Sequence, residues 1–355
     1  MPADHHPWTD RDTQIGRSKM LRSLSSAASL GRVLSGRSLH SVASLRGRSL
    51  LKISDLSQDE LKGLLQLSHE LKALYREGGH AALPQTFAGQ NISMIFQKRS
   101  TRTRLSTESG MSKLGGTAIF LGSEDIQLGV NETMLDTARV MSRFSDLIMA
   151  RVFAHDDVAE LAAEASVPVI NALCDLYHPL QTLADYMTLQ ERFGTDLSGR
   201  SLAWVGDGSN VLHDLMLAAP ALGVDVRVAT PVGYEPANSV TQATEDFASE
   251  YGTKVLLCND PKQAVSGADV VVTDTWISMG QEDETALRLK EFEGYQVTPE
   301  LMDLAADDGV FLHCLPRHQE EVSDDVFYSS RSLVFDEAEN RMWTVMAVML
   351  SIANS

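Results

Sequence analysis

The feature that most constrains the fold is a regular alternation of short apolar segments with longer amphipathic ones. Segments such as 91–96 (NISMIF) and 201–205 (SLAWV) each lead into a stretch whose apolar residues have helical spacing. This alternation predicts parallel strands joined by right-handed helical crossovers. The series is interrupted near residues 197–200 and then resumes. We therefore expect an α/β protein with two doubly wound parallel-sheet lobes.

The interruption also predicts how the chain is divided. We expect a leader over residues 1–45, a first lobe over 46–185, a second lobe over 186–330 and a C-terminal helix over 331–355. Open parallel sheets bind ligands beyond the carboxyl ends of their strands. We therefore expect the active site in a cleft between the two lobes.

Composition argues against several classes of protein. The chain has 355 residues, and its 30 basic and 48 acidic side chains give a formal net charge of −18, which argues against nucleic acid as a partner. It has no apolar run of about 18 residues, so the sequence predicts no membrane-spanning helix. Its three cysteines cannot form a disulfide framework and lack the spacing of zinc ligands.

The N-terminal region differs from the rest of the chain. Residues 13–54 contain eight Lys or Arg, many Ser and no acidic residue, a pattern typical of organelle transit peptides. Abundant arginine favours import into the mitochondrial matrix, with the plastid as the alternative, and we expect the mature protein to begin near residues 44–48. A basic tail that stays on the protein is the other interpretation. Residues 1–19 fit a presequence poorly, so Met20 is an alternative start.

A basic, hydroxyl-rich segment predicts an anion site. Residues 97–104 (QKRSTRTR) follow the apolar segment 91–96 and open a helical stretch. The N–H groups and dipole at a helix N-terminus favour anions. Ser100, Thr101 and Thr103 add hydroxyl donors, and the planar guanidinium of Arg102 suits phosphate oxygens. A solvent-exposed basic helix face is the alternative, but the position directly after a predicted strand favours phosphate binding.

With these residues in view, the chain resembles the aspartate/ornithine carbamoyltransferase family. Residues 100–104 (STRTR) are similar to its carbamoyl-phosphate signature. Five more motifs follow in the family's order, at 149–153 (MARVF), 178–181 (HPLQ), 274–280 (DTWISMG), 313–317 (HCLPR) and 339–341 (ENR). The resemblance extends from about residue 47 to the C-terminus. It implies transfer of the carbamoyl group of carbamoyl phosphate to the δ-amine of L-ornithine, giving L-citrulline and phosphate, without a metal or cofactor.

The resemblance also implies roles for individual residues. The first lobe would bind carbamoyl phosphate and the second would bind ornithine, with Arg102, His178, Asp274 and Cys314 as catalytic residues. His178 and Gln181 would act as donors to the carbamoyl group. The carbamoyl-phosphate contacts would be Ser100, Thr101, Arg102, Thr103, Gln127, Arg151, His178, Gln181, Cys314, Leu315 and Arg341, and the ornithine contacts would be Asn210, Asp274, Ser278 and Met279.

The family also has implications for assembly. Its members are homotrimers, so Gln127 would reach into the site of a neighbouring subunit. Arg341 lies in the C-terminal helix. If Arg341 binds carbamoyl phosphate, that helix must return to the first lobe.

Other interpretations remain open at this level. His178 could form a structural corner with Pro179, Asp274 could cap a helix, and Cys314 could be either an inert buried thiol or a thiolate of low pKa. Residues 206–210 (GDGSN) lack the complete dinucleotide fingerprint, which argues against NAD. The acceptor could be N-acetylornithine, putrescine or aspartate, although the DTWISMGQE string favours ornithine. A non-catalytic relative is the alternative from another class.

Overall fold

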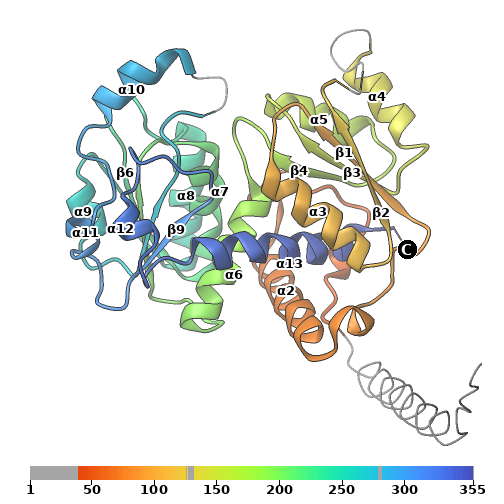
Figure 1. Cartoon of the computed structure of the whole chain (residues 1–355), viewed down its shortest axis with the longest axis horizontal. Helices are drawn as coiled ribbons and strands as arrows, with labels where there is room; N and C mark the ends of the chain where they lie inside the picture. Colours follow the sequence, from red (N-terminus) through yellow and green to blue (C-terminus); the bar gives the residue numbers. More distant parts are fainter. Residues whose placement is uncertain (1–38, 125, 127–131, 279–281, 355) are drawn as a thin grey trace, which may run out of the picture.

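The computed structural model describes residues 39–124, 126, 132–278 and 282–354, which form two α/β lobes side by side (Figure 1). The first lobe contains a four-stranded sheet in the order β2-β1-β3-β4, and all its strand pairs are parallel. Its strands are β1 (Asn91–Phe96), β2 (Thr117–Gly122), β3 (Leu147–Arg151) and β4 (Val169–Leu173). Its helices are α2 (Gln58–Gly78), α3 (Thr101–Lys113), α4 (Met134–Met141) and α5 (His155–Glu164).

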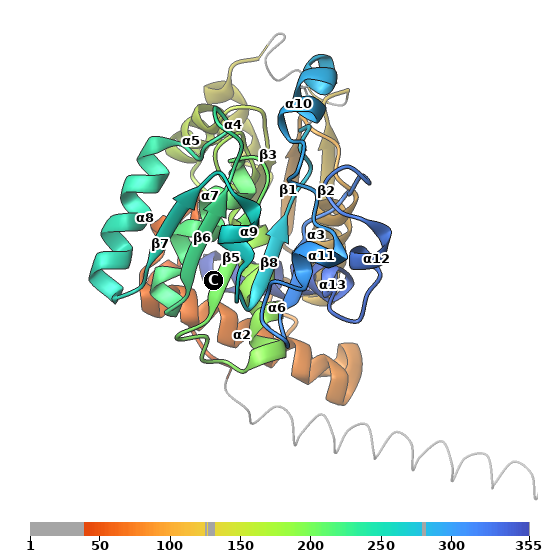
Figure 2. The same ribbon diagram turned by 90° about the vertical axis from the view of Figure 1, so that its left-hand side faces the viewer.

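The second lobe contains a five-stranded parallel sheet in the order β7-β6-β5-β8-β9, and four of these strands follow one another across Figure 2. The strands are β5 (Ser201–Val205), β6 (Asp225–Ala229), β7 (Val255–Cys258), β8 (Val270–Thr273) and β9 (Val310–His313). The helices are α7 (Asn210–Ala218), α8 (Asn238–Tyr251), α9 (Pro261–Val265), α10 (Thr285–Glu291), α11 (Pro299–Met302) and α12 (Asp324–Phe327). The expected fold class is confirmed.

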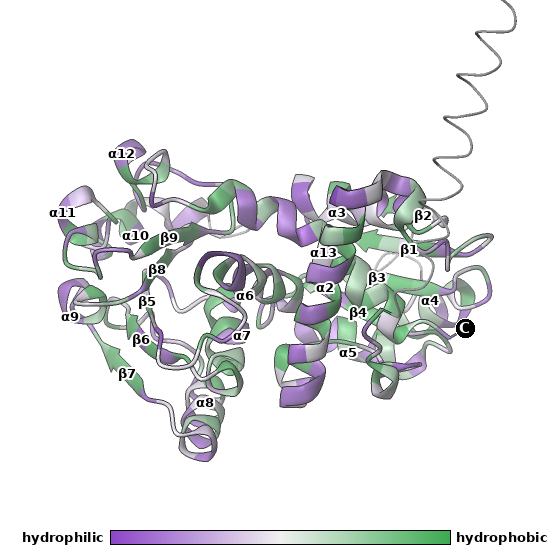
Figure 3. Ribbon diagram, turned by 90° about the horizontal axis from the view of Figure 1, so that it is seen from below, coloured by the Kyte–Doolittle hydropathy of each residue, from purple (hydrophilic) through white to green (hydrophobic). Residues whose placement is uncertain are grey.

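Two helices connect the lobes at their base. These are α6 (Pro179–Phe193) and α13 (Val334–Ile352), and α13 packs on α6, α3 and α2 of the first lobe (Figure 1). Trp343, Met346 and Met349 of α13 are buried there. Strands of both sheets are apolar, whereas polar residues gather on the outer helices (Figure 3). The expected return of the C-terminal helix to the first lobe is confirmed.

In the sequence, residues 57–60 (SQDE) predict a capping box and residues 78–79 (GG) predict a helix end, and both are found in α2. Ser57 and Glu60 form the capping box of α2, and Gly79, at φ 64°, ends this helix in a conformation that favours glycine. Short 3-10 helices supplement the fold: η1 (Ala43–Leu45), η2 (Ile53–Asp55), η3 (Gly79–Ala82), η4 (Pro220–Leu222) and η5 (Glu282–Glu284). No helix of the described ranges is long and apolar enough to cross a bilayer.

The region before α2 packs on the first lobe and also contacts the second, because the N–H of Ile53 donates to Asp214 of α7. Leu50 pairs in parallel with Ile170, beside β4, and the N–H of Gly47 donates to the carbonyl of Ile352 at 2.8 Å. Val42 and Leu45 are buried in the first lobe's core. Most of the expected leader, residues 1–38, lies outside the described residues, but residues 39–45 pack against the folded body.

Candidate active site

The carboxyl ends of the strands from both lobes meet at a cavity of about 660 Å3. The expected cleft is therefore present. Twelve of the residues that the sequence analysis assigned to the site line this cavity. They are Ser100, Thr101, Arg102, Thr103, Arg151, His178, Asn210, Asp274, Ser278, Cys314, Leu315 and Arg341.

The N-terminus of α3 forms one wall of the cavity. Ser100 is the N-cap, and its hydroxyl accepts a hydrogen bond from the N–H of Thr103 at 3.2 Å. Thr101, Arg102 and Thr103 form the first turn, where free N–H groups and the helix dipole attract anions. Arg102 reaches across the cavity and donates to the carbonyl of Leu315 in the other lobe. The segment predicted to bind phosphate is thus at a cavity-facing helix start.

Two buried arginines add positive charge beside this helix. Arg151 is the last residue of β3 and Arg341 lies on α13; their exposed fractions are 6% and 2%. Burial is the main cause that lowers the pKa of each to about 10, with repulsion from neighbouring arginines adding to it, so both remain charged at neutral pH. The Nε atoms of both have no protein acceptor among the described residues. Buried guanidinium groups favour an anionic partner.

His178 precedes Pro179, which occupies the first turn of α6. Its side chain is buried, and burial together with the charges of Arg341 and Arg151 holds its pKa well below the usual range. The imidazole is therefore neutral at physiological pH. Its Nδ1 has no protein partner among the described residues. A neutral imidazole can donate one hydrogen bond to a carbonyl oxygen without bringing a full charge.

Gln181 lies behind the cavity wall, outside the lining residues. Its Nε2 donates to Asp185 Oδ1 at 2.8 Å and to Glu337 Oε1 at 2.6 Å, and its Oε1 accepts from Arg341 Nη1 at 2.5 Å. Both amide hydrogens are thus used within the protein. The donor role expected for Gln181 does not fit this geometry, because packing of α6 against α13 brings two carboxyl groups to its nitrogen.

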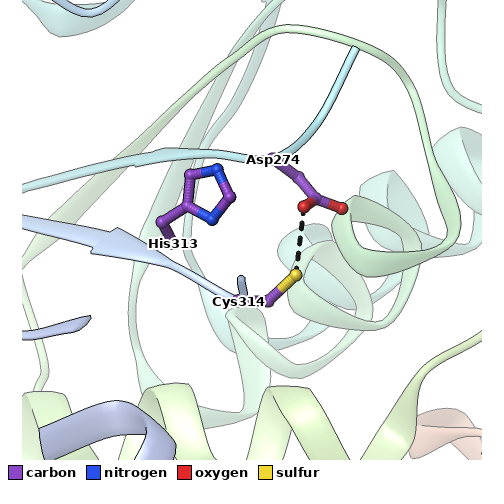
Figure 4. Close-up of side chains that lie close together, drawn as sticks. All are labelled: Asp274, His313 and Cys314. Carbon is purple, nitrogen blue, oxygen red and sulfur yellow. Dashed lines mark hydrogen bonds between the residues drawn. The ribbon is translucent and has the colours of Figure 1, made fainter. Parts of the chain in front are cut away.

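Asp274 and Cys314 face these cations from the second lobe. They follow β8 and β9, neighbouring strands, and the Cys314 thiol donates to Asp274 Oδ1 at 3.0 Å (Figure 4). Burial and the Asp274 charge raise the pKa of Cys314 well above its usual value. This shift and the hydrogen bond to Asp274 favour a neutral Cys314 thiol over a thiolate of low pKa. Burial and a neighbouring carboxylate both disfavour the thiolate.

His313 supports the loop that carries Cys314. It is fully buried, and burial lowers its pKa to about 4. Its Nδ1 accepts from the N–H of Leu315 at 2.9 Å, so Nε2 carries the proton and faces Glu321 Oε1 at 3.3 Å. Leu315 has φ 62°, a conformation that non-glycine residues rarely adopt. The HCLPR motif includes His313, but nothing in the sequence indicates that His313 and Glu321 support this loop.

Ligand atoms of Asp274, His313 and Cys314 lie within 4.8 Å of one another, a spacing that could hold a metal ion (Figure 4). However, these ligand atoms already take part in hydrogen bonds within the protein. The thiol of Cys314 donates to Asp274, and His313 is bonded on both sides of its ring. These contacts favour a hydrogen-bonded arrangement over a set of metal ligands.

Asn210 begins α7, and its amide donates to the carbonyl of Cys174 in the first lobe. The preceding turn requires Gly208, because a Cβ there would lie 2.5 Å from the backbone nitrogen of Pro236. Asp207, in the same turn, pairs with Arg288 at 3.1 Å. The remaining assigned residues, Gln127 and Met279, lie outside the described residues.

Other residues of the cavity were not anticipated. Lys98, Trp276 and His318 also line it. Lys98 belongs to the basic run before the STRTR motif, and its Nζ lies 4.9 Å from the ring centre of Phe153. The sequence could therefore have indicated Lys98. Trp276 and His318 line the cavity because of how their loops fold, which the sequence does not indicate.

Two family models match the chain. Residues 48–191 match the carbamoyl-P binding domain of aspartate/ornithine carbamoyltransferase, and residues 198–352 match the Asp/Orn binding domain. Together these segments cover most of the chain and both lobes.

Similar proteins agree with these models. The chain is 54% identical to the mitochondrial ornithine transcarbamylase of Gallus gallus over 308 residues, which cover 87% of this chain and 86% of that protein. It is 52% identical to the mitochondrial ornithine carbamoyltransferase of Schizosaccharomyces pombe over 305 residues, covering 85% and 93%. The ornithine carbamoyltransferase structure from Pyrococcus furiosus matches with a TM-score of 0.84 and 47% identity, covering 87% of this chain and 98% of that one. The chain therefore belongs to the aspartate/ornithine carbamoyltransferase family.

Proposed function

We propose that this chain transfers the carbamoyl group of carbamoyl phosphate to the δ-amine of L-ornithine, giving L-citrulline and phosphate. The observation that carries the proposal is the division of charge across one cavity. Arg102, Arg151 and Arg341 lie on one side, and the Asp274–Cys314 pair lies opposite. This arrangement suits a phosphorylated donor facing an ammonium acceptor. Relatives that share about half of their sequence with this chain are named ornithine carbamoyltransferases or transcarbamylases.

Carbamoyl phosphate would bind to the first lobe. Its phosphate would take hydrogen bonds from the first turn of α3, through Ser100, Thr101 and Thr103, and charge from Arg102 and Arg151. The carbamoyl oxygen would face His178, whose neutral imidazole polarises the C=O bond. Arg341 would donate to the carbamoyl oxygen, and the backbone carbonyl of Leu315 would accept from the carbamoyl NH2. Positioning of this kind reduces the freedom that the reacting groups must otherwise lose in the transition state.

Ornithine would bind to the second lobe through Asn210, Asp274, Ser278 and Met279. Its δ-amine resembles that of lysine, with a pKa of about 10.4 in water, so that removing its proton at pH 7 costs about 4–5 kcal/mol. Asp274 is the carboxylate beside the cavity, and the Cys314 thiol holds one of its oxygens. We assign Asp274 as the group that receives the ammonium proton, with Cys314 orienting the carboxylate.

The free amine would then attack the carbonyl carbon of carbamoyl phosphate. Arg102, Thr103 and His178 would stabilise the oxyanion of the tetrahedral intermediate. The bond between the carbonyl carbon and the phosphate oxygen then breaks, and phosphate leaves with the second proton of the amine. Juxtaposing two small substrates can contribute about 7–11 kcal/mol of barrier reduction. No step requires a metal or an organic cofactor.

The remaining assignments concern assembly and location. We place carbamoyl phosphate in the lobe over residues 46–185 and ornithine in the lobe over residues 186–330. Of the expected C-terminal segment 331–355, α13 packs on the first lobe, whereas Arg331 and Ser332 contact the second. We propose a homotrimer in which Gln127 approaches a neighbouring site. The protein is mitochondrial: its similar relatives carry that location in their names, and residues 13–54 have the composition of a transit peptide.

The direct test is colorimetric citrulline formation by the purified protein, with and without ornithine. We expect citrulline only when both substrates are present. N-acetylornithine, putrescine and aspartate serve as competing acceptors, and each should react far more slowly than ornithine. Binding of carbamoyl phosphate without any carbamoylated product would contradict the proposal and favour a non-catalytic relative.

A further inference from the structure

Two acidic residues lie behind the cavity and outside its lining, in a place that the mechanism does not use. Asp185 is on α6 and Glu337 is on α13, and each has an exposed fraction of 2%. The Nε2 of Gln181 donates to both carboxyl groups. Glu337 Oε2 also accepts from the backbone N–H of His313 at 3.0 Å, which connects this pair to the end of β9 in the second lobe.

The charges around the pair favour a single shared proton. The facing groups are the Gln181 amide, the Arg341 guanidinium, the Asp274 carboxylate and the N–H of His313. Burial raises the pKa of Asp185 to about 7, and burial together with Asp185 raises the pKa of Glu337 well above its usual value. Two buried carboxyl groups that accept from the same amide nitrogen cannot both ionise readily, which favours one proton shared by the pair.

This arrangement fixes the direction of the Gln181 amide. If the amide were turned over, its oxygen would face a carboxylate and its N–H groups would face the Arg341 cation. Both contacts would be repulsive. In the observed direction, Gln181 Oε1 accepts from Arg341 Nη1, while Thr103 Oγ1 accepts from Arg341 Nη2 at 3.0 Å. Gln181 thereby holds one terminal nitrogen of Arg341 from behind the cavity, and Thr103 holds the other from the cavity wall.

We propose that Asp185 and Glu337 are positioning residues for the carbamoyl-phosphate site. They hold one proton between them, orient the amide of Gln181 and thereby aim Arg341 at the carbamoyl group. Their remaining negative charge balances the charge of Arg341. The hydrogen bond from His313 to Glu337 connects the position of Arg341 to the loop that carries Cys314 and Leu315. The proposal rests on the assignment of Arg341 to carbamoyl phosphate.

The test compares Asp185→Asn with Asp185→Ala in the full chain. The Asn amide oxygen accepts from Gln181, and its NH2 replaces the shared proton by donating to the Glu337 carboxylate. We expect Asp185→Asn to keep the calorimetric Kd for carbamoyl phosphate within about threefold of wild type. Asp185→Ala should raise it about tenfold or more, because it leaves Gln181 and Glu337 with unmatched polar groups. The KM for ornithine should change less than about twofold in either variant.

A double variant separates the shared charge from hydrogen bonding alone. Asp185→Asn with Glu337→Gln keeps polar groups of similar shape but removes the negative charge that faces Arg341. We expect the Kd for carbamoyl phosphate to rise about tenfold in this double variant. Glu245→Ala, on the exposed face of α8, is the matched control and should behave like wild type. If Asp185→Ala fails to fold, Asp185→Ser takes its place.

Three results would overturn the proposal. Asp185→Asn could weaken the binding of carbamoyl phosphate as strongly as Asp185→Ala does. Alternatively, Asp185→Ala could raise the Kd for carbamoyl phosphate and the KM for ornithine by the same factor. The double variant could also bind like wild type. Arg341→Met tests the premise separately. An unchanged Kd in Arg341→Met would remove Arg341 from the carbamoyl-phosphate site and the proposed role of the acidic pair with it, whereas citrulline formation would still test the overall function.

Discussion

The guanidinium groups of the cavity have different partners, and these differences determine what each can do. Gln181 and Thr103 accept hydrogen bonds from Arg341, and the carbonyl of Leu315 accepts one from Arg102, whereas Arg151 is buried at the end of β3. Arg341 is therefore the most constrained of the three, and Arg102 is the one whose acceptor belongs to the other lobe. Asp274 lies opposite them, and one of its carboxylate oxygens accepts a hydrogen bond from the Cys314 thiol.

Replacing Arg102 by alanine should nearly abolish turnover. The variant removes a cation from the phosphate end of the cavity and a donor for the developing oxyanion, so kcat/KM should fall about 100-fold or more. Steady-state citrulline assays measure the change. Arg139→Ala on α4, an exposed residue paired with Glu164, is the control and should retain activity. Near-normal kcat and KM in Arg102→Ala would contradict the assignment.

Replacing Asp274 by alanine should affect the two substrates unequally. The ornithine ammonium loses its carboxylate partner, whereas the carbamoyl-phosphate contacts on the first lobe remain. We expect the KM for ornithine to rise about tenfold or more, and the KM for carbamoyl phosphate to change far less. Initial rates over a grid of both substrate concentrations give the two constants. Equal increases would count against a specific role of Asp274 in ornithine binding.

The sequence indicated individual site residues wherever a motif carried them. Ser100, Arg151, His178 and Asp274 follow or precede predicted strands and helices, and their placement at the cavity needs only that topology. The direction of the Gln181 amide could not be predicted in this way. It depends on Glu337, 156 residues away along the chain, and therefore on how α13 packs against α6. Motif order says nothing about such packing.

At the level of elements, the first turns of α7 connect the two lobes. Asn210 donates to the carbonyl of Cys174, and His213 Nδ1 is 2.9 Å from the carbonyl of Leu176. Asp214 Oδ1 accepts from the N–H of Ile53 at 2.8 Å. These contacts join α7 to the loop before His178 and to the segment before α2, so one helix of the second lobe sets the position of first-lobe residues.

The buried Asp214 predicts a measurable pH dependence of stability. Burial raises its pKa to about 8, whereas an unfolded chain gives about 3.9. Between about pH 3.9 and pH 8, Asp214 is protonated in the folded state and ionised in the unfolded state. The contribution of Asp214 to the free energy of unfolding therefore falls as pH rises, by at most about 1.4 kcal/mol per pH unit. Asp214→Asn removes this titration and should gain stability relative to wild type from pH 5 to pH 8.

Urea unfolding of both proteins at several pH values tests this prediction. Asp246→Asn, on the exposed surface of α8, controls for the loss of an acidic group. Parallel curves for wild type and Asp214→Asn across the pH range would show that Asp214 does not titrate as expected.

Sequence patterns predicted elements with strong local signals and missed those set by tertiary contacts. The capping box fixed the start of α2, and β1 occupies the expected residues 91–96. The apolar residues 167–170 predict a strand, but β4 runs over residues 169–173, and the sequence gives no indication of helix α5. Asn171 interrupts the apolar run of β4 in the sequence, but its amide is buried and donates to the carbonyl of Leu51. A contact from a distant segment thus makes a polar residue compatible with a buried strand.

At the scale of the whole molecule, the sequence correctly predicted two parallel-sheet lobes with a C-terminal helix returning to the first. The order of strands within each sheet was not predicted, because alternation alone does not determine which strands are neighbours. The segment before α2 was expected to belong partly to a leader. In the structure, Val42 and Leu45 are buried against the first lobe, and Gly47 bonds to the end of α13.

A protein that begins at residue 39 should therefore be more stable than one that begins at residue 47. The shorter form loses the burial of Val42 and Leu45, and each fully buried apolar side chain contributes about 1.5–3 kcal/mol. Urea unfolding of the two forms measures the difference. Leu45→Ala in the longer form should reproduce part of the loss. Coincident unfolding curves would contradict the prediction and would fit maturation near residues 44–48.

The hydrogen bond from Arg102 to the Leu315 carbonyl joins the start of α3 to the loop after β9. A phosphate dianion attracts a guanidinium group more strongly than a neutral carbonyl does. The arrival of phosphate would break this tie and leave the Leu315 oxygen ready to accept an N–H from the other end of the same molecule. Acetyl phosphate carries a phosphate but no N–H. It would break the hydrogen bond between Arg102 and Leu315 and leave the Leu315 oxygen without a donor, so it should bind more weakly than carbamoyl phosphate even before an amine is present.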